Sequence, residues 1–262
     1  MPMSEDSLTV SYHSAAQKEI AETFARQQQI VCRPANEIST NLVLHFGEYV
    51  VELKDLLEKS SIHVDFLAGD MAHRKQFGGG RGQSIAKAIG LKSGIQPPHV
   101  LDATAGLARD AYVLANLGCR MTLLEQSPVV AELLKDAISR ASLHNDFQHI
   151  LAQGFELVND DAVNYMQQLK SSHYPDVIYL DPMFPDRKKS AQVKKNMQML
   201  QKLLAHDDNN EALLNAALIT ARKRVVVKRP KGAECLGQHK PSMTIDSKKM
   251  RYDVYVLAAM KN

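Results

Sequence analysis

The chain has 262 residues, of which 45% are hydrophobic and 23% are charged. This length suits one large domain with a small extension, and 13 glycines and 10 prolines are too few for a collagen or a low-complexity protein. The net charge of +3 is common among proteins that bind no polyanion, so the sum alone indicates no class of partner.

The cysteines and the first residues indicate the compartment. Cys32, Cys119 and Cys235 are odd in number and far apart, which is typical neither of a disulfide framework nor of a zinc site. The histidines have no metal-ligand spacing, so we expect no metal. Because the sequence starts MPMSEDSLTV and contains no run of about 18 apolar residues, it predicts neither a signal peptide nor a membrane span. We therefore expect a soluble, cytoplasmic protein.

The first elements predict a small α+β subdomain over residues 1–68. Apolar side chains recur at helical spacing over 15–30, and 42–53 (LVLHFGEYVVEL) contains two alternating runs around Gly47. These patterns predict a helix followed by a hairpin, and 60–66 predicts a further strand. Residues 69–98 are predicted to be a glycine-rich basic loop and a linking helix.

From His99 onward, predicted strands alternate with predicted helices, as in a parallel sheet with crossover helices. The strands are predicted at 99–104, 119–125, 155–160, 176–182 and 223–230. The helices are predicted at 110–117, 128–141, 162–169, 193–204 and 211–221. Beyond Pro230, PSMTIDSKK and RYDVYVLAAM predict two antiparallel strands.

This order of elements is typical of class I S-adenosylmethionine-dependent methyltransferases. We therefore predict an α/β, Rossmann-like domain over 99–262, with a mostly parallel seven-stranded sheet and an antiparallel last strand. Fold alone does not establish an activity, so the site residues must support it.

The turn after the first strand of this domain is DATAGLARD, from Asp102 to Asp110. Gly106 and the small alanines around it allow a ligand to approach the backbone. The turn lacks the GxGxxG pattern that a dinucleotide pyrophosphate requires, whereas S-adenosylmethionine carries no phosphate. The turn therefore favours a methyl donor over a nicotinamide cofactor.

Further acidic residues follow at strand ends. Glu125 lies 23 residues after Asp102, near the spacing at which an acid reaches a ribose diol. Asp160 and Asp161 end the third strand, where they could accept a hydrogen bond from the adenine amine or cap the next helix. Arg109 and Asp110 could contact the ligand or form an ion pair at the helix start.

The fourth strand ends in the most specific local motif, Asp181-Pro182-Met183-Phe184. It matches the (Asp/Asn)-Pro-Pro-(Tyr/Phe) pattern of methyltransferases that act on exocyclic nucleobase amines, with Met183 replacing the second proline. The Asp181 carboxylate and the Pro182 carbonyl can accept hydrogen bonds from such an amine, and Phe184 can stack on an extruded base. The alternative is a strand followed by a turn with a buried Phe.

Residues 187–231 contain 12 Lys and Arg against 3 Asp and Glu. Cations at the carboxyl ends of two strands are predicted to bind RNA phosphates, namely Arg187, Lys188, Lys189, Lys194, Lys195, Lys228 and Arg229. The alternative is a solvated lysine-rich face. Lys223 and Arg224 are predicted at the opposite end of their strand. The segment 73–82 could cover cofactor or RNA as a lid, or be a plain surface loop.

Four segments together resemble the bacterial ribosomal RNA small subunit methyltransferase J (RsmJ) family. They are VDFLAGDMAHRKQFGGGRGQSIAKAIG, DATAGLARDAYVLANLGCRMTLLEQSPVVAELL, VIYLDPMFPDRKKSAQVKKNM and KRVVVKRP. The likeness covers about 64–257, whereas residues 1–63 match more loosely.

The resemblance implies a class I fold, S-adenosylmethionine as donor, and N2-methylation of one guanine near the 3′ end of small-subunit ribosomal RNA. It implies cofactor contacts for Arg109, Asp110, Glu125, Gln126 and Asp181. A family Ser-Ser pair is replaced here by Asp160-Asp161. Either ribosomal RNA or an assembled small subunit would be the partner. An adenine-N6 methyltransferase and a non-catalytic ribosome-assembly module stay open as alternatives.

Overall fold

The computed structural model describes residues 8–38, 40–68, 80–182, 199–200, 210–248 and 250–261. The chain divides into two compact units. The first comprises 1–65, 127–140 and 185–206, and the second comprises 66–126, 141–184 and 207–262. Among the described residues, no helix is both long enough and apolar enough to cross a membrane. Cys32, Cys119 and Cys235 are free thiols.

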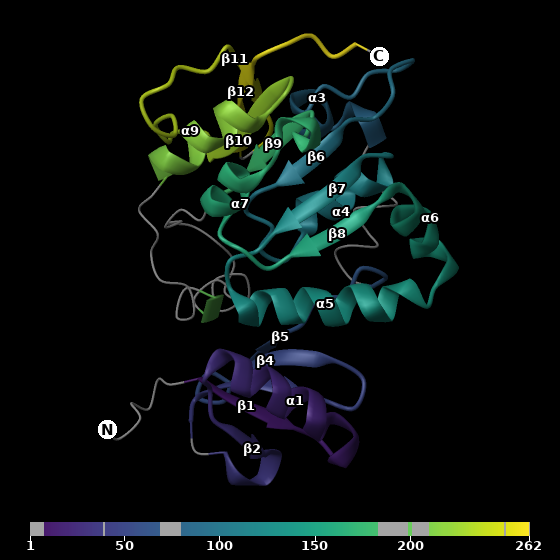
Figure 1. Cartoon of the computed structure of the whole chain (residues 1–262), viewed down its shortest axis with the longest axis vertical. Helices are drawn as coiled ribbons and strands as arrows, with labels where there is room; N and C mark the ends of the chain where they lie inside the picture. Colours follow the sequence, from purple (N-terminus) through teal and green to yellow (C-terminus); the bar gives the residue numbers. More distant parts are fainter. Residues whose placement is uncertain are drawn as a thin grey trace. The chain divides into compact units, whose positions relative to one another are not determined.

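The first unit contains a mixed five-stranded sheet with the order β2-β1-β3-β4-β5 (Figure 1). Its strands are β1 (Leu8–Tyr12), β2 (Cys32–Pro34), β3 (Leu42–Phe46), β4 (Val51–Asp55) and β5 (Ser60–Ile62). Helix α1 (Ala15–Gln28) and the 3₁₀ turn η1 (Ala35–Glu37) connect its first strands. The predicted helix and the β3–β4 hairpin are confirmed.

Two strands of this sheet were not predicted from the sequence. β1 and β2 pair in parallel, and β1 also pairs in parallel with β3. Strands of five and three residues carry too little periodic signal, and parallel partners lie far apart in the sequence. The predicted strand 60–66 is shorter than expected, because pairing with β4 ends at Ile62.

The second unit contains a seven-stranded sheet with the order β11-β12-β10-β9-β6-β7-β8. Its strands are β6 (His99–Asp102), β7 (Arg120–Leu124), β8 (Phe155–Val158), β9 (Val177–Leu180), β10 (Arg224–Pro230), β11 (Met243–Asp246) and β12 (Met250–Val256). Strands β6 to β10 pair in parallel, and β12 is antiparallel to both β10 and β11. The predicted class I methyltransferase topology is therefore confirmed.

The helices connect these strands in sequence order. They are α3 (Ser84–Ala88), α4 (Arg109–Asn116), α5 (Pro128–Ser142), α6 (Asn145–Gln153), α7 (Ala162–Gln168) and α9 (Asn210–Thr220), with 3₁₀ turns η2 (Gly80–Gly82) and η3 (Ser171–His173). Four predicted helices are confirmed as α4, α5, α7 and α9. The expected helix 193–204 lies outside the described residues except at 199–200. Helix α6 was not predicted from the sequence.

The two faces of the large sheet have different characters. On one face, Leu101, Ile178, Leu180, Val225 and Val227 form an apolar core with side chains of α7 and α9. Neighbouring residues of a strand point to opposite faces, so Asp102, Tyr179 and Lys228 lie on the other face. The polar side chains are thereby concentrated on one face of the sheet, at its carboxyl end.

Candidate functional site

All described candidate residues belong to the second unit, and the turn after β6 forms its centre. The N–H of Ala103 donates to the Tyr179 carbonyl in β9 (3.0 Å), and that of Ala105 donates to the Leu124 carbonyl in β7 (3.0 Å). The turn is thus tied to both strands that flank β6. Gly106 and Ala108 have φ values of 53° and 54°. This left-handed conformation is free for glycine but costs roughly 1–2 kcal/mol for alanine, so the turn holds a strained residue at the start of α4.

Glu125 lies directly beside this turn, as the sequence predicts. Glu125 is 7% exposed, and its Oε2 accepts a hydrogen bond from the Gly106 N–H (2.9 Å). The Asn159 side-chain amide donates to the Glu125 carbonyl (2.7 Å) and to the Gln126 carbonyl (3.2 Å). Asn159 was not predicted from the sequence, because the hydrogen bond links positions far apart in the chain. Gln126 itself is exposed at the end of this segment.

Three carboxylates gather on the polar face, and we call Asp102, Asp110 and Asp181 the carboxylate cluster. They come from the end of β6, the first turn of α4 and the residue after β9. The Lys228 ammonium lies 2.6 Å from Asp110 Oδ2 and 2.7 Å from Asp181 Oδ2. The Tyr179 hydroxyl donates to Asp110 Oδ2 as well (2.8 Å). Asp110 thus forms an ion pair with a lysine from a distant part of the sequence.

Burial controls the protonation of this cluster. Asp102 is 2% exposed, and burial raises its pKa to about 8. The hydrogen bond from the Thr104 N–H (3.1 Å) acts in the opposite direction and lowers this pKa. The charges of Asp110 and Asp181 raise this pKa as well. Burial lowers the pKa of Lys228, but these two carboxylates raise it more, so the net shift is upward. Near neutral pH, Asp102 is therefore mostly protonated and Lys228 is charged.

The end of β9 is fixed by the turn of β6. The Asp181 N–H donates to the Thr104 hydroxyl at 2.6 Å. Pro182 is buried, whereas Asp181 is partly exposed. The hydrogen bond therefore fixes the backbone at the start of the DPMF motif, while the Asp181 carboxylate stays accessible. Thr104 and Tyr179 were not predicted from the sequence, although strand alternation places Tyr179 on the same face as Asp181.

Asp160 and Asp161 follow β8, and the capping interpretation is confirmed for Asp161. Its Oδ1 accepts a hydrogen bond from the Asn164 N–H (2.8 Å) at the N-terminus of α7. Asp160 Oδ1 accepts a hydrogen bond from the Asp161 N–H (2.8 Å). These bonds hold both carboxylates at the carboxyl end of β8. Arg109 is exposed one residue before Asp110.

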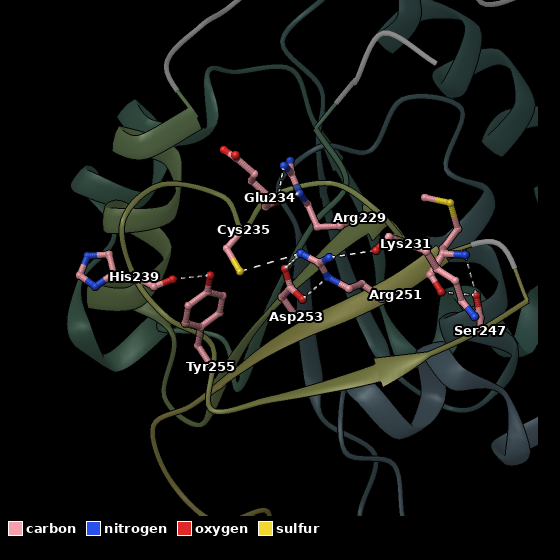
Figure 2. Close-up of polar contacts among 10 residues, drawn as sticks. Arg229, Lys231, Glu234, Cys235, His239, Ser247, Arg251, Asp253 and Tyr255 are labelled. Atoms are coloured by element: carbon pink, nitrogen blue, oxygen red, sulfur yellow. Dashed lines mark hydrogen bonds and ion pairs between the residues drawn. The ribbon is translucent and has the colours of Figure 1, made fainter. Parts of the chain in front are cut away.

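Lys228 and Arg229, which the sequence predicts as phosphate-binding cations, both have partners inside the protein. Lys228 is engaged by two carboxylates, and Arg229 is 6% exposed. The Arg229 Nε–H donates to the Glu234 carbonyl (2.8 Å), as Figure 2 shows. The position of both residues at the carboxyl end of β10 was predicted correctly, but both side chains point toward acceptors inside the protein. As expected, Lys223 lies at the opposite end of β10, where it pairs with Asp176 (3.1 Å).

A second arginine at this edge is also bound internally. The Arg251 guanidinium forms two hydrogen bonds with the buried Asp253 carboxylate, at 2.8 and 3.1 Å (Figure 2). It also donates to the Lys231 carbonyl (3.1 Å). The Arg229 and Arg251 guanidinium groups therefore help to hold the loop that follows β10.

Several predicted residues lie outside the described residues. They are Phe184, Arg187, Lys188, Lys189, Lys194 and Lys195, and the 73–79 part of the glycine-rich loop. In the described part of the chain, no group of three or more His, Cys, Asp and Glu side chains is arranged to hold a metal ion.

Comparison with known proteins gives consistent matches over nearly the whole chain. The family model of SAM-dependent methyltransferases (SAM_MT) matches residues 18–257. The ribosomal RNA small subunit methyltransferase J of Aeromonas salmonicida is 50% identical over 91% of this chain and 96% of the relative. That of Colwellia psychrerythraea is 45% identical over 97% of this chain and 94% of the relative.

A solved structure supports the same assignment. A SAM-dependent methyltransferase from Neisseria gonorrhoeae matches with a TM-score of 0.74 and 35% identity. The match covers 95% of this chain and 96% of that chain.

The residues present fit a sulfonium donor. With Asp102 protonated, Asp110 and Asp181 outnumber the single Lys228 charge, leaving a local excess of negative charge. S-adenosylmethionine carries a sulfonium, an ammonium and one carboxylate, hence an excess of positive charge. Its ribose diol can donate to a carboxylate such as Glu125, which lies beside the same turn. The family model and the solved structure show a SAM-dependent methyltransferase, and the two relatives show that this chain belongs to the ribosomal RNA small subunit methyltransferase J family.

Proposed function

We propose that the protein transfers a methyl group from S-adenosylmethionine to the exocyclic N2 amine of one guanine in bacterial small-subunit (16S) ribosomal RNA. The names of its relatives support the ribosomal RNA as substrate class. The observation that carries the chemistry is the position of Asp181. It opens the DPMF motif at the carboxyl end of β9, beside the turn of β6 and against Lys228.

The proposed mechanism follows from these residue types. An aromatic amine is a poor nucleophile because its lone pair is delocalised into the ring. Hydrogen bonds from the amine to the Asp181 carboxylate and the Pro182 carbonyl favour the pyramidal nitrogen that can attack. Phe184 supplies a stacking face for the extruded base. The bound donor supplies an electrophilic methyl group on a sulfonium.

The remaining site residues are assigned by the same reasoning. Donor-binding roles are proposed for Asp102, Gly106, Arg109, Asp110, Glu125, Gln126, Asp160, Asp161 and Asp181. In this assignment Glu125 accepts hydrogen bonds from the ribose hydroxyls, while Asp160 or Asp161 accepts one from the adenine amine. The Asp161 capping bond uses one carboxylate oxygen, so a cap and a ligand contact are compatible.

Phosphate binding is proposed for Arg187, Lys188, Lys189, Lys194 and Lys195, which follow the DPMF motif. Naked ribosomal RNA and the assembled small subunit are both candidate forms of the partner. We propose that the protein acts in the cytoplasm, where such a substrate is found. The domain boundaries 1–68, 69–98 and 99–262 are part of the same proposal.

The test uses small ribosomal subunits from a strain that lacks the gene, purified protein and radiolabelled donor. Wild-type protein should label one guanine, and mapping of the base distinguishes guanine N2 from adenine N6. Asp181→Ala should reduce kcat by about 100-fold or more, because the amine loses its charged acceptor. Asp246→Ala, at an exposed position in β11, is the control and should keep wild-type kcat. Absence of label with every ribosomal substrate would refute the proposal.

A further inference from the structure

Lys228 is placed next to Asp181 by the register of the sheet. Strands β9 and β10 pair in parallel, with Val227 opposite Leu180. Both of these residues point into the apolar core with α7 and α9. Because side chains alternate, the following residues, Lys228 and Asp181, point together toward the face that carries α4. The register of the sheet therefore places Lys228 next to Asp181.

The ammonium bridges two carboxylates that come from different elements. Its Nζ lies 2.6 Å from Asp110 Oδ2 and 2.7 Å from Asp181 Oδ2. The exposed fractions of the side chains are 18% for Lys228, 12% for Asp110 and 35% for Asp181. Asp110 is held in turn by the Tyr179 hydroxyl (2.8 Å). A chain of short contacts thus runs from a buried tyrosine to the most exposed carboxylate of the cluster.

We propose that Lys228 is a positioning residue for methyl transfer, which holds the Asp181 carboxylate in one orientation against Asp110. This inference rests on the proposed function, because it concerns the group that accepts the amine hydrogen bond. It replaces the phosphate-binding role that the sequence predicts for Lys228. Without the ammonium, two like charges would face each other in a partly buried site, and the carboxylates would move apart.

The rate of methyl transfer depends on the geometry of the hydrogen bond between the amine and Asp181. Displacement of a catalytic group by about 1 Å can cost about 100-fold in rate. The ammonium of Lys228 carries several N–H donors and can serve both carboxylates at once. An arginine at this position keeps the charge and the donors but not the compact shape, so it should restore part of the function.

Lys228→Met and Lys228→Arg are compared with Lys223→Met, which removes an ion-paired lysine at the opposite end of the same strand. Steady-state kinetics with gene-deleted small subunits give kcat and the KM for RNA. Lys228→Met should lower kcat by about 100-fold and change the RNA KM by less than about 3-fold. Lys228→Arg should retain at least about one tenth of the wild-type kcat. Lys223→Met should leave both constants within about 2-fold.

Crystal structures of wild type and Lys228→Met give a readout besides activity. The Asp181 and Asp110 carboxylates should rotate or separate in the variant. Unchanged carboxylates, an unchanged kcat, or a raised RNA KM at constant kcat would each overturn the proposal. If Lys228→Met does not fold, Lys228→Gln, which keeps a donor without the charge, takes its place. If wild-type protein labels no RNA, the proposed function fails, whereas the crystal structures still decide the positioning role.

Discussion

At the scale of single residues, the feature that stands out is a carboxylic acid buried at the end of β6. Asp102 is 2% exposed, and its pKa is raised to about 8 chiefly by burial. In the unfolded chain, the same group ionises at about pH 4. Between these values the folded chain binds a proton that the unfolded chain releases, so stability falls as pH rises from about 4 to 8. Natural proteins retain such costs mainly where a ligand uses the group.

Asp102→Asn should therefore stabilise the free protein at pH 8 and weaken its affinity for the donor. The amide keeps an acceptor for the Thr104 N–H without the cost of burying a charge. We expect a Tm higher by about 2–4 °C at pH 8, equivalent to about 1 kcal/mol for a domain of this size, and a smaller gain at pH 5. Thermal unfolding at both pH values and calorimetry with the donor measure the two effects. A variant less stable than wild type at pH 8 would contradict the assigned cost of burial.

At the scale of elements, the carboxyl ends of adjacent strands collect the site. β6, β7 and β9 are neighbours in the sheet, and their last residues lead directly to Asp102, Glu125 and Asp181. A hydrogen bond from the Gly106 N–H to the Glu125 carboxylate then connects the turn after β6 to the end of β7. A shift of one strand by one residue would move these side chains to the other face, so strand register controls the chemistry.

Helix α7 provides a test of the two roles considered for Asp161. Asp161→Ala removes the cap at the N-terminus of α7 and should cost about 1 kcal/mol, or about 2–4 °C in Tm. Asp161→Asn keeps a capping oxygen and should retain most of this stability. Donor affinity measured on both variants by calorimetry then reports the proposed adenine contact separately. Equal Tm values for wild type and Asp161→Ala would show that the cap contributes nothing.

At the scale of the whole molecule, a net charge of +3 conceals a segregated distribution. Residues 187–231 carry a local charge of +9, so the remaining residues sum to −6. Within this segment, Lys228 and Arg229 have internal partners, and we propose phosphate contacts for the cations directly after the DPMF motif.

RNA binding should therefore depend steeply on salt, whereas donor binding should not. Replacing Arg187, Lys188 and Lys189 with Gln should lessen the slope of log K against log salt by about 0.7–0.9 for each phosphate that the variant no longer neutralises. Lys223→Gln, at the other end of β10, should leave the slope unchanged. Fluorescence anisotropy with ribosomal RNA at several salt concentrations gives the slopes. Equal slopes for RNA and donor would count against phosphate binding by the cations after the DPMF motif.

The order of elements in the large domain and the positions of its site motifs could be predicted from the sequence. Periodicity, strand-end acids and the DPMF motif are local signals, and parallel strands bring their carboxyl ends to one edge whatever the details of packing. Short strands such as β1 and β2 were missed, because their pairing depends on distant partners. The partner that each charged side chain binds depended on tertiary structure. Lys228 and Arg229 follow one another in the sequence, yet one bridges two carboxylates and the other binds a loop carbonyl. A sequence specifies how many charges a strand end carries, whereas burial and the nearest acceptors in space determine which of them can reach a ligand.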